Sequence, residues 1–317
     1  MTKIYNQTPQ NTLVLYHASC ADGFGAAFAT WMQLADQAEY KAVRYGETLS
    51  DASFDTLIRD RKVILLDFSF DRPRTMHLFK AASEVVWLDH HKTAFEMWCG
   101  LDYLLQQDRF EQQLDDQHYI LLDNQKSGAL LAWEYFQPKI PAPPLIRYID
   151  DTDRWQFQMP NAREFIRSLW SYTPWSFSHW KKLLNPIDEE RMVQEGKAIQ
   201  RAHEQNTFSV MKGGQRSCQL RSGEQIALGL AANCPPHLTS DVGHLLAEQS
   251  GTFGLCWLQN KDGLVICSLR STGEYDVSAI ASWFGGGGHR NAAGFQTDMK
   301  TLQDWLSVAD NKPRNGS

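Results

Sequence analysis

Apolar runs alternate with helical patterns in the first half of the chain. Four of these runs are rich in Val, Ile and Leu: Thr12–Tyr16, Lys62–Leu66, Glu84–Leu88 and Tyr119–Leu122. Unbroken apolar runs of this length are typical of strands that are buried on both faces of a parallel sheet. Helical patterns follow three of them, at Gly25–Leu34, Arg72–Ala82 and Ser127–Tyr135. This alternation predicts an α/β domain with a doubly wound parallel sheet.

The pattern changes near residue 185. The breaker Asn185-Pro186 precedes Asp188–Gln205, a charged stretch without aromatic residues that predicts a linker helix. Beyond it we expect strands at Arg216–Leu220, Gln225–Ala231, Thr252–Leu258 and Leu264–Leu269, and helices at Ser240–Gln249 and Val277–Trp283. The sequence therefore predicts a first domain over 1–186, a linker helix over 187–210, a smaller α/β domain over 211–309 and a flexible tail over 310–317.

Composition and charge restrict the class of protein. Hydrophobic residues make up 43% of the chain and charged residues 21%, the balance of a soluble globular protein. No apolar run approaches the roughly 20 residues that cross a bilayer, and the first ten residues lack the layout of a signal peptide, so we expect a cytoplasmic protein without a membrane partner. The six scattered cysteines contain no CxxC pair, which argues against a zinc ribbon and a disulfide framework.

The net charge of −6 bears on the partner. A protein that grips long duplex nucleic acid usually carries a basic surface, because each phosphate contact needs Lys or Arg. The acidic excess instead predicts a small anionic substrate that is held locally. The oligomeric state is left open, with a homodimer among the alternatives.

Acidic and histidine side chains directly follow three of the predicted strands. His17 and Asp22 come after the first strand, Asp67 after the second, and Asp89-His90-His91 after the third. In open parallel sheets the functional crevice lies beyond the carboxyl ends of the strands. We therefore expect these side chains to meet at one edge of the sheet.

Carboxylates and imidazoles gathered in this way need a cationic partner. A further acidic set, Asp150, Asp151 and Asp153, follows the apolar pattern Leu145–Ile149. Any one such residue is more often a helix cap or a turn residue, but three strand ends together predict a metal site. Mixed His and Asp ligands suit Mn²⁺, Fe²⁺ or Zn²⁺ better than Ca²⁺. Two metals about 3.5–4 Å apart can share a carboxylate, activate water and clamp a phosphoryl group.

Two motifs resemble those of a known superfamily. Asp89-His90-His91 after an apolar strand resembles the signature of the DHH phosphoesterases. Gly286-Gly287-Gly288-His289, continued by Ala292-Ala293-Gly294-Phe295, resembles the hallmark of the associated DHHA1 domain. The motifs lie about 200 residues apart, and the resemblance covers essentially the whole chain. It points to the group of nano-RNases, pAp phosphatases and pGpG hydrolases.

The resemblance also implies roles for single residues. Asp67 would bridge two divalent metal ions, and the other ligands would be His17, Asp22, His90 and Asp151. Asp89 would orient a neighbouring side chain, whereas His91 would lie beside the scissile phosphate and assist the leaving oxygen. Mn²⁺ is the favoured metal, with Fe²⁺, Zn²⁺ and Mg²⁺ as alternatives.

Cys20 departs from the pattern of the superfamily. The first motif commonly holds two acids in a D-x-D arrangement, and Cys20 stands where the first acid would be, before Asp22. A thiolate ligand would favour a borderline-soft metal such as Zn²⁺ or Fe²⁺. Alternatively, Cys20 is a small buried filler and a water takes its place at the metal. We treat Cys20 as a candidate ligand and keep both readings.

The glycine-rich segment of the second domain is a candidate phosphate site. Gly285–Gly288 has no side chains in the way of a phosphate, and its backbone N–H groups can line a shallow nest. Arg270 and Ser271 end an apolar strand of the same domain. The resemblance implies that this domain reads a terminal phosphate through Arg270, Ser271, Gly286, Gly287, Gly288 and His289. A flexible glycine turn is the alternative.

Eight aromatic residues crowd the stretch from Trp155 to Trp180. Such rings can stack on bases. An aromatic core beneath the helices that complete the first domain is the better supported reading. Ser127-Gly128-Ala129 is predicted to start a helix rather than to take part in chemistry.

These features predict a two-metal phosphodiesterase that hydrolyses very short 5′-phosphorylated RNA to mononucleotides, with linear dinucleotides such as pGpG as the leading substrates. Three alternatives lie within the superfamily: a phosphatase of pAp and related bisphosphates, a cyclic-dinucleotide phosphodiesterase and a single-strand exonuclease. An alternative of another class is a nucleotide-binding regulatory protein without catalysis, because Cys20 replaces an expected acid.

Overall fold

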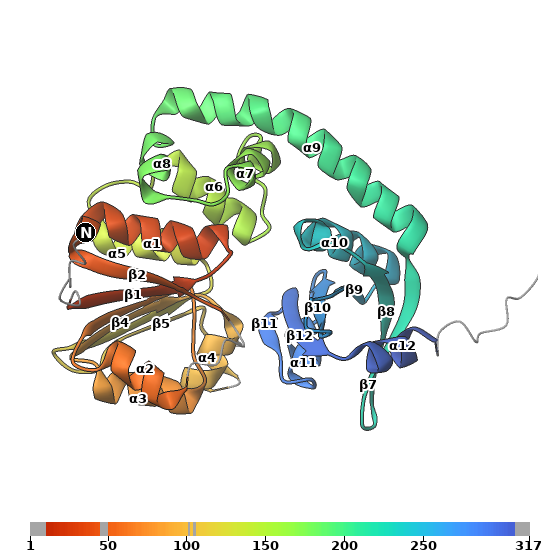
Figure 1. Ribbon diagram of the computed structural model, residues 1–317, viewed down its shortest axis with the longest axis horizontal. Helices are drawn as coiled ribbons and strands as arrows, with labels where there is room; N and C mark the ends of the chain where they lie inside the picture. The colour runs from red at the N-terminus through yellow and green to blue at the C-terminus, as the bar shows by residue number, and fades with distance from the viewer. Residues whose placement is uncertain (1–10, 45–49, 101, 104–105, 308–317) are drawn as a thin grey trace, which may run out of the picture. The chain divides into compact units, whose positions relative to one another are not determined.

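The computed structural model describes residues 11–44, 50–100, 102–103 and 106–307 (Figure 1). The chain divides into two compact units, one up to Gln200 and one from Arg201, and each unit contains a six-stranded sheet. The division falls inside helix α9 (Pro186–Gly214), so a helix does occupy the stretch Asp188–Gln205. The predicted domain limits stay predictions, and the predicted tail 310–317 lies outside the described residues.

The sheet of the first unit has the strand order β2-β1-β3-β4-β6-β5. Its four central strands are those predicted from the apolar runs, to within one residue at either end: β1 (Thr12–His17), β3 (Lys62–Leu66), β4 (Glu84–Asp89) and β6 (His118–Asp123). The edge strands β2 (Ala38–Val43) and β5 (Arg109–Gln113) were not predicted. All neighbours in this sheet pair in parallel except β5, which pairs antiparallel with β6.

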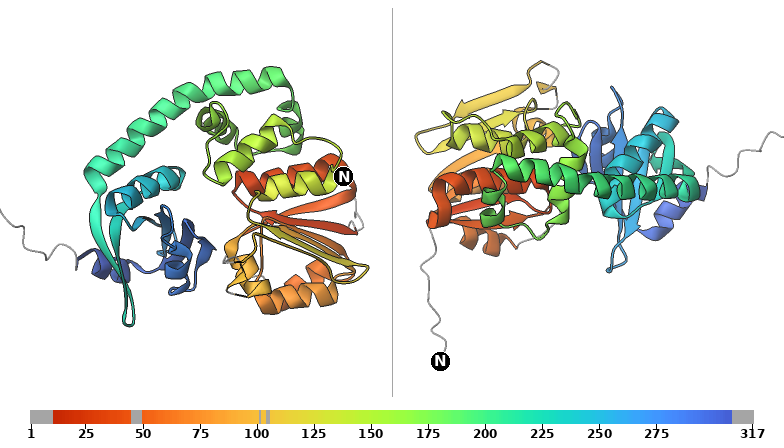
Figure 2. Two further views of the ribbon diagram at one scale, coloured as in Figure 1. Left: turned by 180° about the vertical axis from the view of Figure 1, so that it is seen from behind. Right: turned by 90° about the horizontal axis from the view of Figure 1, so that it is seen from above.

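Helices cover both faces of this sheet, as predicted for a doubly wound domain (Figures 1 and 2). Alternate residues of each strand point to opposite faces. Val14, Ile64 and Leu88 pack with α1 (Ala21–Leu34) and α5 (Gly128–Phe136). Leu13, Leu65 and Trp87 pack on the other face with α2 (Asp51–Ile58), α3 (Arg72–Ala81) and α4 (Lys92–Cys99).

Three further helices complete the face that α1 and α5 cover: α6 (Pro144–Asp153), α7 (Ala162–Ser171) and α8 (Phe177–Lys182). The aromatic stretch lies here. Phe165 and Trp180 are fully buried, and the Trp180 ring meets Phe24 of α1 edge to face at 4.7 Å. These contacts support the reading of this stretch as an aromatic core. A short turn of 3-10 helix, η1 (Ala35–Gln37), links α1 to β2.

The second unit is built on a sheet of strand order β11-β12-β10-β9-β8-β7. Its strands are β7 (Arg216–Ser222), β8 (Gln225–Asn233), β9 (Phe253–Gln259), β10 (Val265–Ser271), β11 (Gly287–His289) and β12 (Ala292–Thr297). Helix α10 (Thr239–Ser250), entered through η3 (Pro236–Leu238), covers one face, and α11 (Val277–Ser282) and α12 (Met299–Ser307) cover the other. Four strands and two helices confirm the predicted pattern, and β11, β12 and α12 add to it.

None of the helices in the described ranges is both long enough and apolar enough to cross a membrane.

Candidate metal centre

Three neighbouring strands bring the candidate ligands to one edge of the first sheet. The register pairs Tyr16 of β1 with Leu66 of β3, and Leu66 with Leu88 of β4. The next residues of the three strands are therefore His17, Asp67 and Asp89. The predicted meeting of these side chains beyond the carboxyl ends of the strands is confirmed.

Two groups of side chains there can each hold a metal ion. One group is His17, Asp67 and His91; the other is Asp22, Asp67 and His90; within each group the ligand atoms lie within 4.8 Å of one another. Asp67 belongs to both. Its Oδ1 lies 3.1 Å from His90 Nε2, and its Oδ2 lies 3.5 Å from His17 Nδ1. Each oxygen thus faces a different histidine, which is the arrangement that a bridging carboxylate needs.

The backbone holds Asp67 in an unusual conformation. Its φ angle is +51°, in the left-handed region, and its N–H donates to the carbonyl oxygen of Leu88 over 2.9 Å. Aspartate tolerates this region better than most residues do, and backbone strain of this kind is often found at functional sites. The turn directs the Asp67 carboxylate into the protein, where the residue is 1% exposed.

Helix α5 holds Asp22 from the opposite side. Asp22 Oδ2 accepts from Gly128 N–H over 2.6 Å, and Asp22 Oδ1 accepts from Ala129 N–H over 2.8 Å. These donors lie in the first turn of α5, where a helix favours a negative charge. Each carboxylate oxygen retains a second lone pair for a cation. Gly128 has no room for a side chain, because a Cβ would lie 2.6 Å from Asp67 Cβ and 3.0 Å from Asp22 Oδ2.

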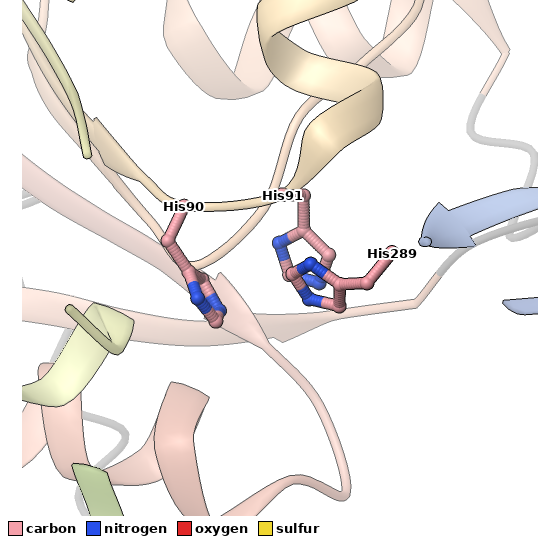
Figure 3. A group of neighbouring side chains, drawn as sticks. All are labelled: His90, His91 and His289. Atoms are coloured by element: carbon pink, nitrogen blue, oxygen red, sulfur yellow. The ribbon is translucent and has the colours of Figure 1, made fainter. Parts of the chain in front are cut away.

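Asp89 organises the segment that carries the two histidines. Its Oδ1 accepts from the N–H groups of His90 and His91 over 2.8 and 3.2 Å and lies 2.7 Å from His91 Nδ1. An ionised carboxylate only accepts, so Nδ1 of His91 carries the hydrogen and Nε2 carries the lone pair of the neutral ring. Figure 3 shows the side chains of His90 and His91, which belong to the segment between β4 and α4. Their ring centroids lie 4.8 Å apart. This geometry is consistent with Asp89 as an orienting residue.

The acidic segment at the end of α6 differs from what we expected. Asp151 was predicted as a ligand, yet its Oδ1 accepts from Gln158 N–H over 2.7 Å and its Oδ2 from Met159 N–H over 3.0 Å. These bonds hold the turn after α6. Asp153 Oδ2 instead lies 3.6 Å from His90 Nε2, and its side chain is 27% exposed. Because Asp153 is the acid of this segment that lies beside His90, the geometry favours it over Asp151 as the acid that this segment contributes, and the role of either as a ligand stays a prediction.

Cys20 lies directly before α1 and is half-buried. Burial raises the pKa of its thiol well above the ordinary value, and the negative charges of Asp67, Asp153 and Asp22 raise it further. Among the described residues, Cys20 belongs to neither of the two groups that can hold a metal. Its role as a ligand stays a prediction.

Protons and negative charges are closely coupled in this cluster. Burial disfavours the charged form of His90, but its hydrogen bond with Asp67 and the charges of Asp153 and Asp22 outweigh burial and raise its pKa to about 10. Burial also acts to raise the pKa of Asp67, yet the surrounding imidazoles of His17, His90 and His91 outweigh it and hold the pKa below the ordinary range. In the absence of metal, these interactions favour a proton on His90 next to an ionised Asp67.

This donor set fits divalent cations. Asp67 Oδ2 is buried, and no hydrogen bond reaches it from the part of the chain that the structure describes. A buried carboxylate oxygen without such a bond is costly unless a cation approaches it. Imidazole nitrogens mixed with carboxylate oxygens suit Mn²⁺, Fe²⁺ and Zn²⁺.

The predicted substrate residues of the second unit have several structural contacts. Arg270 Nη2 donates to Ser240 Oγ over 3.1 Å. Ser271 is buried, and its hydroxyl donates to the carbonyl oxygen of Tyr275 over 2.6 Å and accepts from Asn291. Ser271 therefore holds the segment after β10 in place. His289 is half-buried at the end of β11.

The glycine segment forms a strand in part, rather than only an open nest. Gly287, Gly288 and His289 pair antiparallel with Gly294, Ala293 and Ala292 of β12. A Cβ on Gly286 would collide with the carbonyl oxygen of Gly294, and Gly288 has a φ of +142°. These glycines are needed for a close approach of two backbone segments. Any phosphate contact by this segment stays a prediction.

Comparison with known proteins shows one related sequence. No family model matches the chain. Uncharacterized protein R106 of Acanthamoeba polyphaga mimivirus is 33% identical over an alignment of 310 residues, which covers 92% of this chain and 68% of the viral protein. The chain belongs to the family of this viral protein.

Two solved structures show a more distant likeness. RecJ from Thermus thermophilus in complex with Mn²⁺ has a TM-score of 0.49 and 13% identity, and the match covers 95% of this chain. The chain spans about half of that RecJ chain, since 52% of it is covered. The pGpG-specific phosphodiesterase PggH from Vibrio cholerae has a TM-score of 0.44 and 12% identity, with 94% of this chain and 96% of that chain covered. Scores and identities this low do not establish a shared activity.

Proposed function

We propose that this chain is a metal-dependent phosphodiesterase that hydrolyses very short 5′-phosphorylated RNA, with linear dinucleotides such as pGpG as its leading substrates. The observation that carries the proposal is the position of Asp67, a buried carboxylate that belongs to two ligand groups at once. A shared carboxylate of this kind is typical of two-metal phosphoesterase sites. The resemblance of Asp89-His90-His91 to the DHH signature supports the same assignment.

The residues that would hold the metals follow from the two groups. His17 and Asp67 of the first group, and Asp22, Asp67 and His90 of the second, would be ligands, and Asp153 would join them next to His90. His91, the third member of the first group, is assigned to proton transfer instead. Divalent cations bound there would activate water and neutralise the charge that develops on the phosphoryl oxygens.

His91 would move a proton during the reaction. Burial acts to lower its pKa, but the charge of Asp89 and its hydrogen bond outweigh burial, so the pKa is raised. Because Asp89 accepts from Nδ1, a second proton on the ring would lie on Nε2. From there it can pass to the leaving oxygen as the ester bond breaks. His91 would thus act as the general acid.

The preference for a short substrate is part of the proposal. We assign the first unit as a DHH domain and the second as a DHHA1 domain, joined through α9. Arg270 and His289 of the second unit would read a terminal phosphate, which would favour dinucleotides over long RNA. The net charge of −6 supports a small anionic partner rather than a duplex. A cytoplasmic site of action stays a prediction.

One assay tests the proposal directly. The protein loaded with Mn²⁺ is incubated with pGpG, GpG, pAp, a cyclic dinucleotide and a long RNA. We expect pGpG to be hydrolysed to GMP, and GpG roughly ten- to a hundredfold less efficiently, because a charge-assisted contact to a phosphate is worth about 1.5–3 kcal/mol. Similar efficiency towards pGpG, GpG and the long RNA would favour the exonuclease alternative.

A matched pair of variants tests the metal centre. Asp67→Asn removes the charge and keeps a side chain that tolerates a left-handed backbone. We expect it to lose Mn²⁺ binding and several orders of magnitude of turnover, since the metals supply both nucleophile and charge stabilisation. Asp60→Asn is the control, because Asp60 also has a positive φ, of +58°, and is exposed. If Asp67→Asn keeps more than about a tenth of the turnover, the two-metal assignment is wrong.

A further inference from the structure

Arg44 lies at the same edge of the sheet as the metal centre. Strand β2 pairs in parallel with β1, and the register sets Val43 opposite His17. Arg44 directly follows Val43, so it lies beyond the carboxyl end of β2, next to the segment after β1. Ala18 N–H donates to the carbonyl oxygen of Val43 over 2.8 Å, which ties that segment to the end of β2.

The guanidinium group of Arg44 reaches over this segment. Arg44 Nη2 donates to Ser19 Oγ over 3.2 Å, and both residues are exposed. Ser19 lies between two candidate ligands, His17 and Asp22, and has a φ of +57°. Arg44 therefore presents a positive charge to solvent beside the segment that carries both ligands.

Two other cations near this edge already have acidic partners. Arg154 Nη1 lies 3.5 Å from Asp150 Oδ2, and Lys92 Nζ lies 3.1 Å from Glu96 Oε1. Arg44 differs, because its hydrogen bond goes to a neutral hydroxyl and no ion pair links it to an acid within the described ranges. A guanidinium has five N–H donors, so most of them remain available to a ligand.

The charge of the loaded site indicates what this ligand is. Asp22, Asp67, Asp89 and Asp153 carry four negative charges when ionised, and two divalent cations carry four positive charges. With His17 and His90 neutral, the four carboxylates balance the two cations, and His91 as the protonated general acid adds one positive charge. A phosphodiester and the hydroxide that attacks it bring two negative charges, so one cation besides His91 and the metal pair is needed to offset them. The planar fork of arginine matches two phosphate oxygens at once.

We propose that Arg44 binds the non-bridging oxygens of the scissile phosphate, from the side of the site opposite to β4. This assignment rests on the proposed function, and it makes Arg44 a residue that contacts the substrate rather than the metals. The bond to Ser19 holds the guanidinium beside the segment that carries His17 and Asp22 before the substrate arrives.

Three variants test the assignment. With Mn²⁺ and pGpG, Arg44→Ala should lower kcat/KM roughly ten- to a hundredfold, the range for loss of one charge-assisted hydrogen bond. Arg44→Lys should recover part of this loss, because it restores the charge without the fork. Arg59→Ala is the control: Arg59 is an exposed arginine that pairs with Asp55 in α2 and precedes β3, at the other end of the sheet. It should leave kcat/KM unchanged.

Two more measurements separate a contact with the substrate from a structural role. Mn²⁺ affinity of Arg44→Ala, measured by calorimetry, should stay within about threefold of the wild type, and added guanidinium ion should restore part of its activity. A parallel fall in Mn²⁺ affinity, or equal kcat/KM in Arg44→Ala and wild type, would overturn the role of Arg44 while leaving the proposed function intact. A wild-type protein that binds Mn²⁺ but cleaves no phosphodiester would overturn both.

Discussion

Gly128 is the position at which one added carbon atom should disturb the metal centre most directly. It begins α5, its N–H donates to Asp22, and a Cβ there would lie 2.6 Å from Asp67 Cβ. The Asp67 Cβ is fixed to the main chain, so it cannot swing aside as the tip of a long side chain would. Gly128→Ala must therefore push α5 away from the turn that carries Asp67.

The size of the effect follows from two opposing terms. Adding a carbon to a well-packed site costs about 1–3 kcal/mol. Alanine is also the better helix former, by up to about 1 kcal/mol. We expect a net destabilisation of about 0–3 kcal/mol, or up to several degrees in Tm for a unit of this size. The displacement should weaken Mn²⁺ binding more clearly, by about 10- to 100-fold, as when a residue that orients a metal ligand is lost.

Calorimetric Mn²⁺ titration and thermal unfolding of the metal-free protein measure these two effects. Gly213→Ala is the matched control, because Gly213 also lies in a helix and a Cβ there would meet no atom within 4 Å. It should bind Mn²⁺ as the wild type does and be equally or slightly more stable. Wild-type Mn²⁺ affinity in Gly128→Ala would refute the reasoning, since the contact with Asp67 would then have no consequence for the site.

Four further predictions concern the same cluster. The pKa of His90 in the metal-free fold is about 10, above the value of 6.5 expected in the unfolded chain. Protonated His90 therefore stabilises the metal-free fold fully below about pH 6.5, and this stabilisation is lost as the pH rises through 10. The Tm of the metal-free protein should fall over that pH range. Mn²⁺ binding at pH 7 should accordingly release protons, which calorimetry in two buffers of different ionisation enthalpy detects. Cys20→Ser should weaken Zn²⁺ binding more than Mn²⁺ binding if the thiolate is a ligand, and equal affinities would assign Cys20 to packing. Asp153→Asn should weaken Mn²⁺ binding at least tenfold, whereas Asp151→Asn should mainly lower Tm because it loosens the turn after α6; the reverse result would restore Asp151 as the ligand.

The buried part of the fold could be predicted because its signal is local. β1, β3, β4 and β6 are buried on both faces, and their apolar runs are unbroken. The edge strands have no such run. β5 (RFEQQ) is almost wholly exposed, and β2 mixes buried and exposed positions, so only pairing with a neighbouring strand reveals them as strands.

The sequence also showed which candidate ligands directly follow a strand. It did not show which of two acids near the end of a helix faces the metal centre. His17, Asp67 and Asp89 follow apolar runs whose ends the sequence marks. Asp151 and Asp153 differ by two positions near the end of α6, and that difference turns their side chains by about 200° around the helix axis. Which of them faces His90 depends on how α6 packs, and no local pattern contains that information.

The glycines also show what the sequence alone could not predict. Gly128 was interpreted only as part of a helix start, and Gly285–Gly288 as an open phosphate nest. In the structure both segments are places of close approach: a Cβ on Gly128 would meet the Asp67 side chain, and a Cβ on Gly286 would meet the carbonyl oxygen of Gly294. A glycine in a sequence indicates that a side chain is absent, but only the fold shows whether a ligand or another segment fills that space.

The contacts of the cluster explain how so many acids can coexist before metals bind. Asp22 receives two N–H groups from the start of α5, and Asp89 receives two from the main chain. Those bonds orient the carboxylates without any cation, so the ligand frame forms as part of folding. Asp67 differs, because its Oδ2 accepts no hydrogen bond from the described chain and its neighbours at that edge are imidazoles. Hydrogen bonds therefore orient the carboxylates of Asp22 and Asp89 before metals bind, whereas Asp67, which both ligand groups share, still lacks a hydrogen-bond partner for its Oδ2 among the described residues. Cations that displace the proton from His90 would supply that partner.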